Sequence, residues 1–310
     1  MRILVVGAGA VGGYFGARLA RAGRDVTFLV RAGRAQLLER RGLRITGLGE
    51  ETVLRPRVIR TGGIDAPYDV VLLAVKATGL EQAVDDMAAA VGPHSLVVPV
   101  LNGVRHVDVL AARFGDQAVL GGVSKVATTL DDQGDIVRLA PLQDLRYGAR
   151  RNTAPARLDE VHRVLSGAGF TTGLSDDIDA EIWAKWVFIA ALGAVTCLMR
   201  GSVGEVTAVP GGTAFARQVV DECASVAAAA GYPVPAPALQ QTLATLTEAG
   251  SPLTSSLYRD VTANRDAETE HIYGDLVLRA HRLGLTVPLL DLVTMHLRLH
   301  QNRIEGARLT

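Results

Sequence analysis

A glycine-rich turn near the start of the chain has the spacing of a site that binds the phosphates of a dinucleotide. The pattern G-x-G-x-x-G covers six consecutive residues, Gly7, Ala8, Gly9, Ala10, Val11 and Gly12. The first glycine allows a tight turn, the second allows backbone to approach a pyrophosphate, and the third allows a helix to pack on a strand. Because a strand-like segment precedes the turn and a helical one follows it, we predict dinucleotide binding.

The end of the second predicted strand favours a phosphorylated cofactor. An acidic residue there would bind the ribose 2′-hydroxyl of NAD, but residues 27–32 include no acid and contain Arg31. A guanidinium can pair with a 2′-phosphate, so we predict NADP(H), with Arg34 as a second candidate for that contact. The alternative is that Arg31 is an ordinary surface arginine.

Only three of the 32 basic residues are lysines, and two of these stand where an ammonium could do chemistry. Lys185 lies between the two tryptophans of the chain, at the entrance to its most apolar segment. Desolvation there would make the ammonium a readier proton donor near neutral pH. The alternative is a lysine whose stem packs on tryptophan while its head reaches water. Lys76 directly follows a predicted strand, and Lys125 has no comparable explanation.

Other polar groups have weaker local arguments. Asn102 follows the next apolar strand after Lys76, at the edge where parallel sheets bind ligands, although an Asn-Gly turn explains it equally well. Residues 254–271 are rich in hydroxyls, acids and arginines, as a capped helix start with a solvated face would also be. Cys197 and Cys223 show no metal-ligand or disulfide spacing, so we predict no metal site and two free thiols.

Composition excludes several classes of protein. Basic and acidic residues balance at 32 each, which argues against a nucleic-acid binder. Hydrophobic residues make up 48% of the chain, as in an ordinary folded protein. The longest uncharged apolar segment, residues 186–199, is shorter than the roughly 20 residues that span a bilayer. We expect a cytoplasmic protein with no membrane partner, and a homodimer is the candidate assembly.

The elements that must position these residues follow from the pattern of apolar runs. In the first half, short apolar runs alternate with helical segments, which is typical of βαβ units and a parallel sheet. Strands are predicted at residues 2–6, 25–30, 69–75, 95–100 and 119–127, and helices at residues 10–22, 34–41, 80–91 and 104–114. Two further strands, 136–139 and 145–148, flank Pro141.

Strand patterns end near Asp176, and only helices are predicted beyond it. These cover residues 180–199, 213–230, 238–249, 265–283 and 289–300. Glycines at 167, 169 and 173 loosen the intervening chain. We therefore expect an α/β Rossmann-type domain over residues 1–170 and an all-α domain over residues 176–310.

Taken together, the motifs resemble the ketopantoate reductase family, the NADPH-dependent 2-dehydropantoate 2-reductases, over nearly the full chain. Six pieces occur in family order: the glycine turn, Leu29-Val30-Arg31, Ala74-Val75-Lys76-Ala77, Leu101-Asn102-Gly103-Val104, Glu181-Ile182-Trp183-Ala184-Lys185, and the stretch from Ser255-Ser256 to Glu268. Ser256 and Glu268 keep the family spacing of twelve residues, with Asp260 and Arg265 at matching positions between them.

The resemblance implies a role for each matching residue on the cofactor side. The glycine turn would bind NADP(H), and Arg31 would bind its 2′-phosphate. Lys76 and Asn102 would line the rim shared by the cofactor and the substrate. The reaction would belong to pantothenate biosynthesis.

On the substrate side, the resemblance implies that Lys185 and Glu268 are catalytic. Lys185 would be the general acid, Ser256 would hold the carboxylate of a small 2-keto acid, and Glu268 would orient polar groups of substrate and cofactor. Negative charge develops on the ketone oxygen during reduction, and a positioned ammonium both stabilises that charge and supplies the proton.

Three departures from the family leave the substrate open. Ile189 and Gly193 stand four and eight residues after Lys185, where the family usually carries asparagines, and Val203 replaces a third. Apolar residues there leave a pocket with less grip on a hydroxylated substrate. We therefore weigh 2-dehydropantoate against a more apolar 2-keto acid.

Two further alternatives concern the activity itself. A 3-hydroxy acid dehydrogenase has a related architecture, but the spacing of Ser256 and Glu268 speaks against it. A non-catalytic NADP(H)-binding sensor is disfavoured because both Lys185 and Glu268 are retained.

Overall fold

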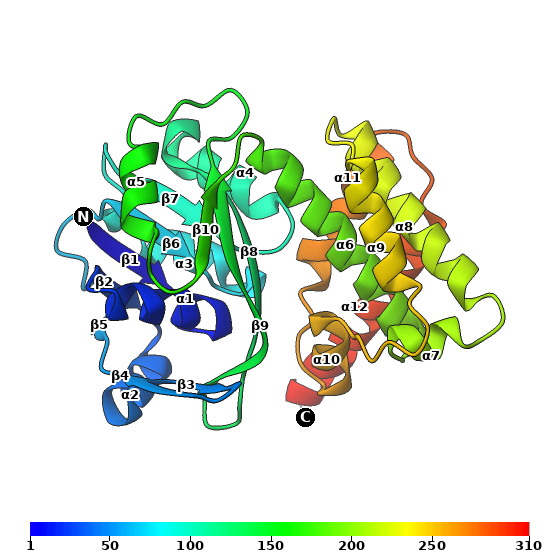
Figure 1. The fold of residues 1–310 in the computed structure, drawn as a ribbon, viewed down its shortest axis with the longest axis horizontal. Helices are drawn as coiled ribbons and strands as arrows, with labels where there is room; N and C mark the ends of the chain where they lie inside the picture. Colours follow the sequence, from blue (N-terminus) through cyan, green and yellow to red (C-terminus); the bar gives the residue numbers. More distant parts are fainter. Residues whose placement is uncertain (310) are drawn as a thin grey trace. The chain divides into compact units, whose positions relative to one another are not determined.

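The computed structural model describes residues 1–309, and the chain divides into two compact units at Asp179/Ala180. Unit 1 contains every strand of the described residues together with helices, and unit 2 is helical (Figure 1). The predicted fold class, an α/β Rossmann-type domain followed by an all-α domain, is confirmed.

A parallel sheet of five strands, in the order β5-β2-β1-β6-β7, lies at the centre of unit 1. Its strands are β1 Arg2–Val6, β2 Asp25–Leu29, β5 Arg57–Ile59, β6 Val70–Leu73 and β7 Leu96–Pro99. In register, Val6 lies opposite both Leu29 and Leu73. The carboxyl ends of these strands therefore meet at one edge, which is where open α/β sheets bind ligands.

Apolar side chains cover both faces of this sheet. Along β1, Ile3 and Val5 belong to one buried cluster and Leu4 and Val6 to another, since successive side chains of a strand point to opposite faces. The helices of unit 1 are α1 Ala10–Arg21, α2 Ala32–Arg41, α3 Leu80–Asp86, α4 Arg105–Phe114 and α5 Leu158–Leu165. The first four correspond to predicted helices, and α5 does not.

A second, mixed sheet also packs against α1, which contacts strands of both sheets. Its strands are β3 Leu43–Gly47, β4 Glu50–Leu54, β8 Gly121–Leu130, β9 Ile136–Gly148 and β10 Thr171–Leu174. β8 and β9 form a long antiparallel hairpin, and β9 pairs in addition with β3 and β10 (Figure 1). The chain around residues 167–173, predicted to be a loosened junction, thus contains a strand.

The hairpin corrects the prediction around Pro141. The strands predicted at residues 136–139 and 145–148 are one strand, β9, which runs through the proline. The register with β8 shifts there: Val126 pairs with Gln143, whereas Thr128 pairs with Arg138. Because Pro141 lies in this irregular stretch, its missing N–H removes no ladder hydrogen bond.

Unit 2 consists of helices. They are α6 Ile178–Met199, α7 Val203–Thr207, α8 Gly212–Ala229, α9 Ala236–Leu246, α10 Ser256–Thr262, the π-helix η4 Glu270–Gly274, α11 Asp275–Arg282 and α12 Pro288–Leu309. Of these, α8 packs against α7, α9, α11 and α12. By length and composition alone α6 could cross a membrane, but 67% of its most apolar 18-residue window is buried inside the structure. Such burial is typical of a core helix.

The helix predicted over residues 265–283 is wrong in its first part. Glu268 has a φ of +51°, in the left-handed region that ends a right-handed helix. The chain then resumes as η4 and α11. Short polar side chains and acids at 260–270 resemble a helix start, but the start lies later than the composition suggests.

Glu50 on β4 joins the second sheet to α1. Its carboxylate accepts hydrogen bonds from Arg18 at 2.6 Å and from Arg138 at 3.0 Å, and all three side chains are at most 14% exposed. Burial alone would raise the pKa of Glu50, but the hydrogen bonds from Thr52 and the two arginines outweigh it and lower the pKa below its ordinary value. A carboxylate with a lowered pKa stabilises the fold above the ordinary carboxyl range and loses that contribution as pH falls through its folded pKa.

We therefore expect Glu50→Gln to lower the free energy of unfolding by about 3 kcal/mol at pH 7, because it leaves two half-buried guanidinium groups facing each other. Urea unfolding of both proteins at pH 7 and at pH 3.5 measures this. The difference between the two proteins should shrink at the lower pH, and a difference independent of pH would contradict the proposed role of the carboxylate.

Candidate active site

The glycine turn leaves the end of β1 and opens α1 at the ligand-binding edge of the parallel sheet. Gly7 has a φ of +94°, which strongly favours glycine. Its N–H donates to the carbonyl of Leu29 at 3.0 Å, which fixes the turn to the end of β2. The N-terminus of α1, with its unpaired N–H groups, follows at once, so the predicted arrangement of strand, glycine turn and helix is present.

The three glycines differ in what surrounds them, and the difference fits a bound pyrophosphate. A Cβ on Gly12 would lie 2.2 Å from the carbonyl oxygen of Gly7 and 2.8 Å from the side chain of Ala74. Gly12 is therefore required for packing within the protein. A Cβ on Gly9 would meet no protein atom within 4 Å. The open face of the turn at Gly9 is where a ligand can approach the backbone.

Arg31 lies just beyond the end of β2, as the N-cap residue of α2, and is exposed. Its guanidinium extends toward the segment that follows β6, because a Cβ on Gly79 would lie 2.8 Å from Arg31 Nη2. That segment starts at Ala74 and includes Lys76, also exposed. Arg31 and Lys76, both predicted to bind the cofactor, thus follow β2 and β6, the two strands that flank β1.

Asn102 completes the set of predicted residues in unit 1. It follows the end of β7 and is half-buried, directly before Gly103, whose φ is +73°. The parallel sheet therefore brings the glycine turn, Arg31, Lys76 and Asn102 to the same edge.

Lys185 is half-buried on α6 and lies between Trp183 and Trp186 in the sequence. Trp183 stacks on Tyr232 with ring centroids 5.4 Å apart, and it contacts Trp186 with centroids 4.9 Å apart. Both tryptophans are almost fully buried. The lysine is thus placed at the border between a dry aromatic cluster and accessible surface, where an ammonium can serve as proton donor.

Glu268 lies two residues before η4 and is held in a strained conformation, with its φ of +51°. A non-glycine residue at positive φ costs about 1 kcal/mol or more, and such strain gathers at functional sites. The backbone N–H of Glu268 donates to Asp266 Oδ1 at 3.0 Å, and its carbonyl accepts from the N–H groups of His271 and Ile272, each at 3.1 Å. π-Helical turns such as the one that follows are also frequent at functional sites.

Two side-chain hydrogen bonds fasten η4 to α6. Trp186 Nε1 donates to the carbonyl of Ile272 at 3.0 Å, and the Tyr273 hydroxyl donates to the carbonyl of Ala190 at 2.7 Å. The segment that contains Glu268 is therefore held against the helix that contains Lys185.

A third contact attaches α10 to the same helix. The buried Ser255 caps α10 by accepting from the N–H of Tyr258 at 2.9 Å, and its hydroxyl lies 2.8 Å from Thr196 Oγ1 on α6. Ser256, the next residue, is exposed. Within unit 2, the segments of Ser256 and Glu268 are thus attached to α6, the helix that contains Lys185.

The structure shows what surrounds Ile189, Gly193 and Val203, the three residues that stand where the resemblance predicts asparagines. A Cβ on Gly193 would lie within 2.4 Å of the Tyr273 hydroxyl oxygen, so the absent side chain is what admits the tyrosine. Ile189, one turn after Lys185, is half-buried and apolar, and Val203 is fully buried. Beyond the lysine, α6 is therefore apolar at Ile189, and the Tyr273 hydroxyl occupies the space beside Gly193.

Several residues that shape the site were not predicted. Tyr273 and Gly79 act through packing and belong to no motif with a chemical signature. Ser255 acts as a helix cap; it lies in the stretch that matches the family, but the resemblance gave it no role of its own. Only Ser255 had a local signal, as a serine at the start of a helix.

The residues that the structure describes include neither a candidate metal site nor a reactive thiol. No group of three or more histidines, cysteines or acids there could hold a metal ion. Both cysteines are free and buried, and burial raises the pKa of the Cys197 thiol to about 12. Such a thiol is a poor nucleophile near neutral pH.

The two units match a known pair of domains. Residues 3–152 match the family model described as ketopantoate reductase PanE/ApbA, and residues 177–301 match the model of its C-terminal domain. The chain is 33% identical over 301 residues to the uncharacterized oxidoreductase YkpB of Bacillus subtilis, an alignment that spans 97% of this chain and 99% of the relative. It is 30% identical to a 2-dehydropantoate 2-reductase of Archaeoglobus fulgidus, over 92% of each protein.

The chain also superposes on solved structures over nearly its full length. A ketopantoate reductase of this family from Ralstonia eutropha JMP134 superposes with a TM-score of 0.88 at 26% identity, covering 98% of this chain and 100% of the other. A D-mandelate dehydrogenase, solved with NADH and anilino(oxo)acetate, superposes with a TM-score of 0.87 at 20% identity, again over 98% and 100%. The second likeness concerns the fold alone.

The contrast between the glycines yields a test of the turn. We expect Gly9→Ala to leave the melting temperature nearly unchanged but to weaken dinucleotide binding at least tenfold, because its methyl group points only into the open face. Gly12→Ala should lower the melting temperature by several degrees, because its methyl group meets the Gly7 carbonyl. Thermal unfolding and cofactor titration separate the two; normal binding by Gly9→Ala would place the ligand elsewhere.

Proposed function

The chain belongs to the ketopantoate reductase family of oxidoreductases, and on that premise we propose that it reduces a 2-keto acid to the 2-hydroxy acid with NADPH. The observation that carries the proposal is the attachment of the segments of Ser256 and Glu268 to α6, the helix that contains Lys185. 2-Dehydropantoate is the first candidate substrate, since family relatives act on it.

Lys185 has the central chemical role in this proposal. Reduction of the ketone requires a hydride, which a reduced nicotinamide bound at the glycine turn would supply. As charge develops on the ketone oxygen, the Lys185 ammonium stabilises it and donates the proton. Ser256 donates its hydroxyl to the substrate carboxylate, and Glu268 orients the polar groups around the reacting carbon.

Arg31 supports the choice of NADPH over NADH. Its exposed guanidinium follows β2, where an acid would be expected in a site for NAD, and it extends toward Gly79 in the segment after β6. A guanidinium at this place can pair with a 2′-phosphate, which NADPH carries and NADH lacks.

A more apolar 2-keto acid is the second candidate substrate. Where a hydroxylated substrate would need polar partners, α6 presents Ile189, and Tyr273 fills the place of a side chain at Gly193. The Tyr273 hydroxyl is buried and donates to the Ala190 carbonyl, so it is committed to the protein. A branched or aromatic substituent on the keto acid would suit such a surface better than a hydroxyl group.

The first test concerns the lysine. We expect Lys185→Ala to lower kcat by about 10²–10⁴-fold with less than a threefold change in the Kd of NADPH, because the ammonium acts on the substrate oxygen. Lys125→Ala is the matched control: this exposed lysine lies on β8, opposite Asp144, and its loss should change neither constant. Near-normal turnover by Lys185→Ala would remove the lysine from the mechanism.

The second test concerns the substrate. NADPH oxidation is followed with 2-dehydropantoate and with branched and aryl 2-keto acids that lack its hydroxyl group. If the apolar surface decides, kcat/KM for the best apolar acid should exceed that for 2-dehydropantoate at least tenfold. The reverse order would support 2-dehydropantoate as the substrate. Tight NADPH binding without turnover of any acid would point instead to a sensor.

A further inference from the structure

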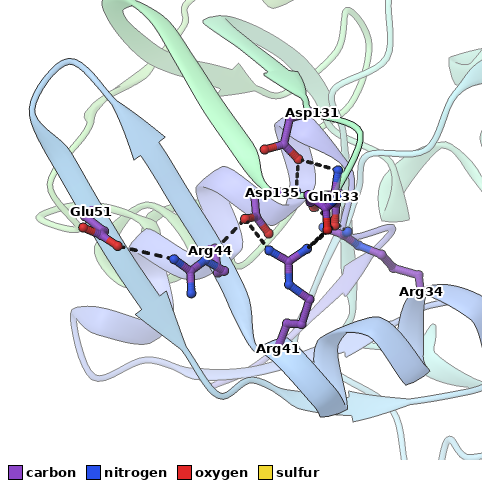
Figure 2. Close-up of polar contacts among 8 residues, drawn as sticks. Arg34, Arg41, Arg44, Glu51, Asp131, Gln133 and Asp135 are labelled. Atoms are coloured by element: carbon purple, nitrogen blue, oxygen red, sulfur yellow. Dashed lines mark hydrogen bonds and ion pairs between the residues drawn. The ribbon is translucent and has the colours of Figure 1, made fainter.

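The tip of the β8–β9 hairpin is fastened by three arginines (Figure 2). Within the tip, Asp131 Oδ1 accepts from the N–H groups of Gln133 at 2.9 Å and Asp135 at 2.8 Å, which shapes the turn. Asp135 then pairs with Arg41 at 2.9 Å and with Arg44 at 3.3 Å, so the tip is tied to α2 and β3.

The third arginine, Arg34 on α2, makes a different connection. Its Nη1 donates to the carbonyl of Gly134 in the hairpin tip at 2.7 Å, and its Nε donates to the carbonyl of Ala8 in the glycine turn at 2.8 Å. Burial lowers the pKa of this guanidinium, although the charge of Asp135 opposes the shift. Arg34 thus bridges two backbone segments that are far apart in sequence.

The hairpin is built to admit this bridge. Gly134 has a φ of +76°, and a Cβ there would lie 2.6 Å from Leu37 Cδ2 and 2.8 Å from Arg34 Nη1. Only glycine leaves room for the guanidinium at this place. The same hairpin makes a second tie to the start of α1, because Thr128 Oγ1 donates to the carbonyl of Ala10 at 3.1 Å.

A hydrogen bond to the Ala8 carbonyl also fixes the N–H that follows it. The peptide between Ala8 and Gly9 is trans, as are all peptide bonds among the described residues, and in a planar trans peptide the C=O and N–H point in opposite directions. With its oxygen held toward Arg34, this peptide presents the Gly9 N–H on the other side. The turn is open at this residue, since a Cβ on Gly9 would meet no protein atom within 4 Å.

We propose that Arg34 is a positioning residue for the dinucleotide: by holding the Ala8 carbonyl it aims the Gly9 N–H at the pyrophosphate. The inference rests on the proposed function only in that the glycine turn binds a nicotinamide dinucleotide. It assigns Arg34 a role different from a contact with the 2′-phosphate, for which the sequence made it a candidate beside Arg31. The pyrophosphate is common to NADPH and NADH, whereas the 2′-phosphate is not, so the two roles give different results.

The test compares the Kd of NADPH and of NADH, measured by titration, in the full-length wild-type protein and its variants. Arg34→Gln should raise both constants by a similar factor, on the order of tenfold. The ratio of the two constants should stay within about threefold of the wild-type ratio, and kcat at saturating NADPH should be nearly unchanged. Arg34→Lys, which keeps one donor, should recover part of the lost affinity for both cofactors.

Two matched variants distinguish the alternatives. Arg31→Ala should weaken NADPH alone and so shift the ratio, as expected of a direct contact with the 2′-phosphate. Arg41→Gln loosens the hairpin tip without touching the glycine turn, and it should lower the melting temperature at least as much as Arg34→Gln while both Kd values stay near wild type.

Three results would overturn the proposal. These are a loss in Arg34→Gln confined to NADPH, an equal loss of affinity in Arg41→Gln, and unchanged affinity for both cofactors in Arg34→Gln. If the wild-type protein bound neither cofactor, the failure would lie with the proposed function itself.

Discussion

The close approach of Gly12 to the carbonyl of Gly7 is the constraint on which unit 1 depends. Without a side chain at Gly12, α1 can pack directly against the end of β1 and the side chain of Ala74. That position lets α1 contact the second sheet as well, where Gly13 leaves room for Ile136. α1 contributes Tyr14, Phe15, Ala17 and Leu19 to the larger buried cluster of unit 1. A single absent Cβ therefore determines both the ligand-binding turn and the packing of two sheets.

In unit 2, one buried helix, α6, positions later segments of the chain through hydrogen bonds. α6 presents a backbone carbonyl at Ala190 and a hydroxyl at Thr196, and each receives a polar side chain from a later segment of the chain. A third bond leaves α6 from Trp186. Buried polar groups of this kind must be paired, so each bond specifies one placement of its segment. The site residues that these segments contain are positioned by the same bonds.

The sequence predicts the fold class and the residues of the motifs because their signals are local. Continuous apolar runs mark the parallel strands that are covered on both faces, and the glycine spacing marks the turn. β3, β4 and β10 carry no such signal: they are short and partly exposed, and β4 even begins with two acids, Glu50 and Glu51. Their pairing depends on residues far along the chain, which no local pattern records.

Positioning residues escape prediction for a related reason. Arg34 is one of many arginines in the sequence, and only its contacts with two carbonyl oxygens distinguish it. The turn at Glu268 is likewise invisible in composition, because its acids and hydroxyls also favour a helix start. What a side chain touches across the fold is decided by tertiary packing, whereas the motif residues are recognisable from chain neighbours alone.

The fit of Tyr273 against Gly193 also restricts how the substrate preference of this chain could change over generations. An asparagine at Gly193 would collide with the tyrosine hydroxyl as long as Tyr273 remains. A smaller residue at Tyr273 must therefore arise first, and that intermediate would carry an empty space in the core and leave Trp186 with a loosened neighbour. A change from glycine to asparagine at residue 193 therefore requires two substitutions in a fixed order and passes through an intermediate of lower stability.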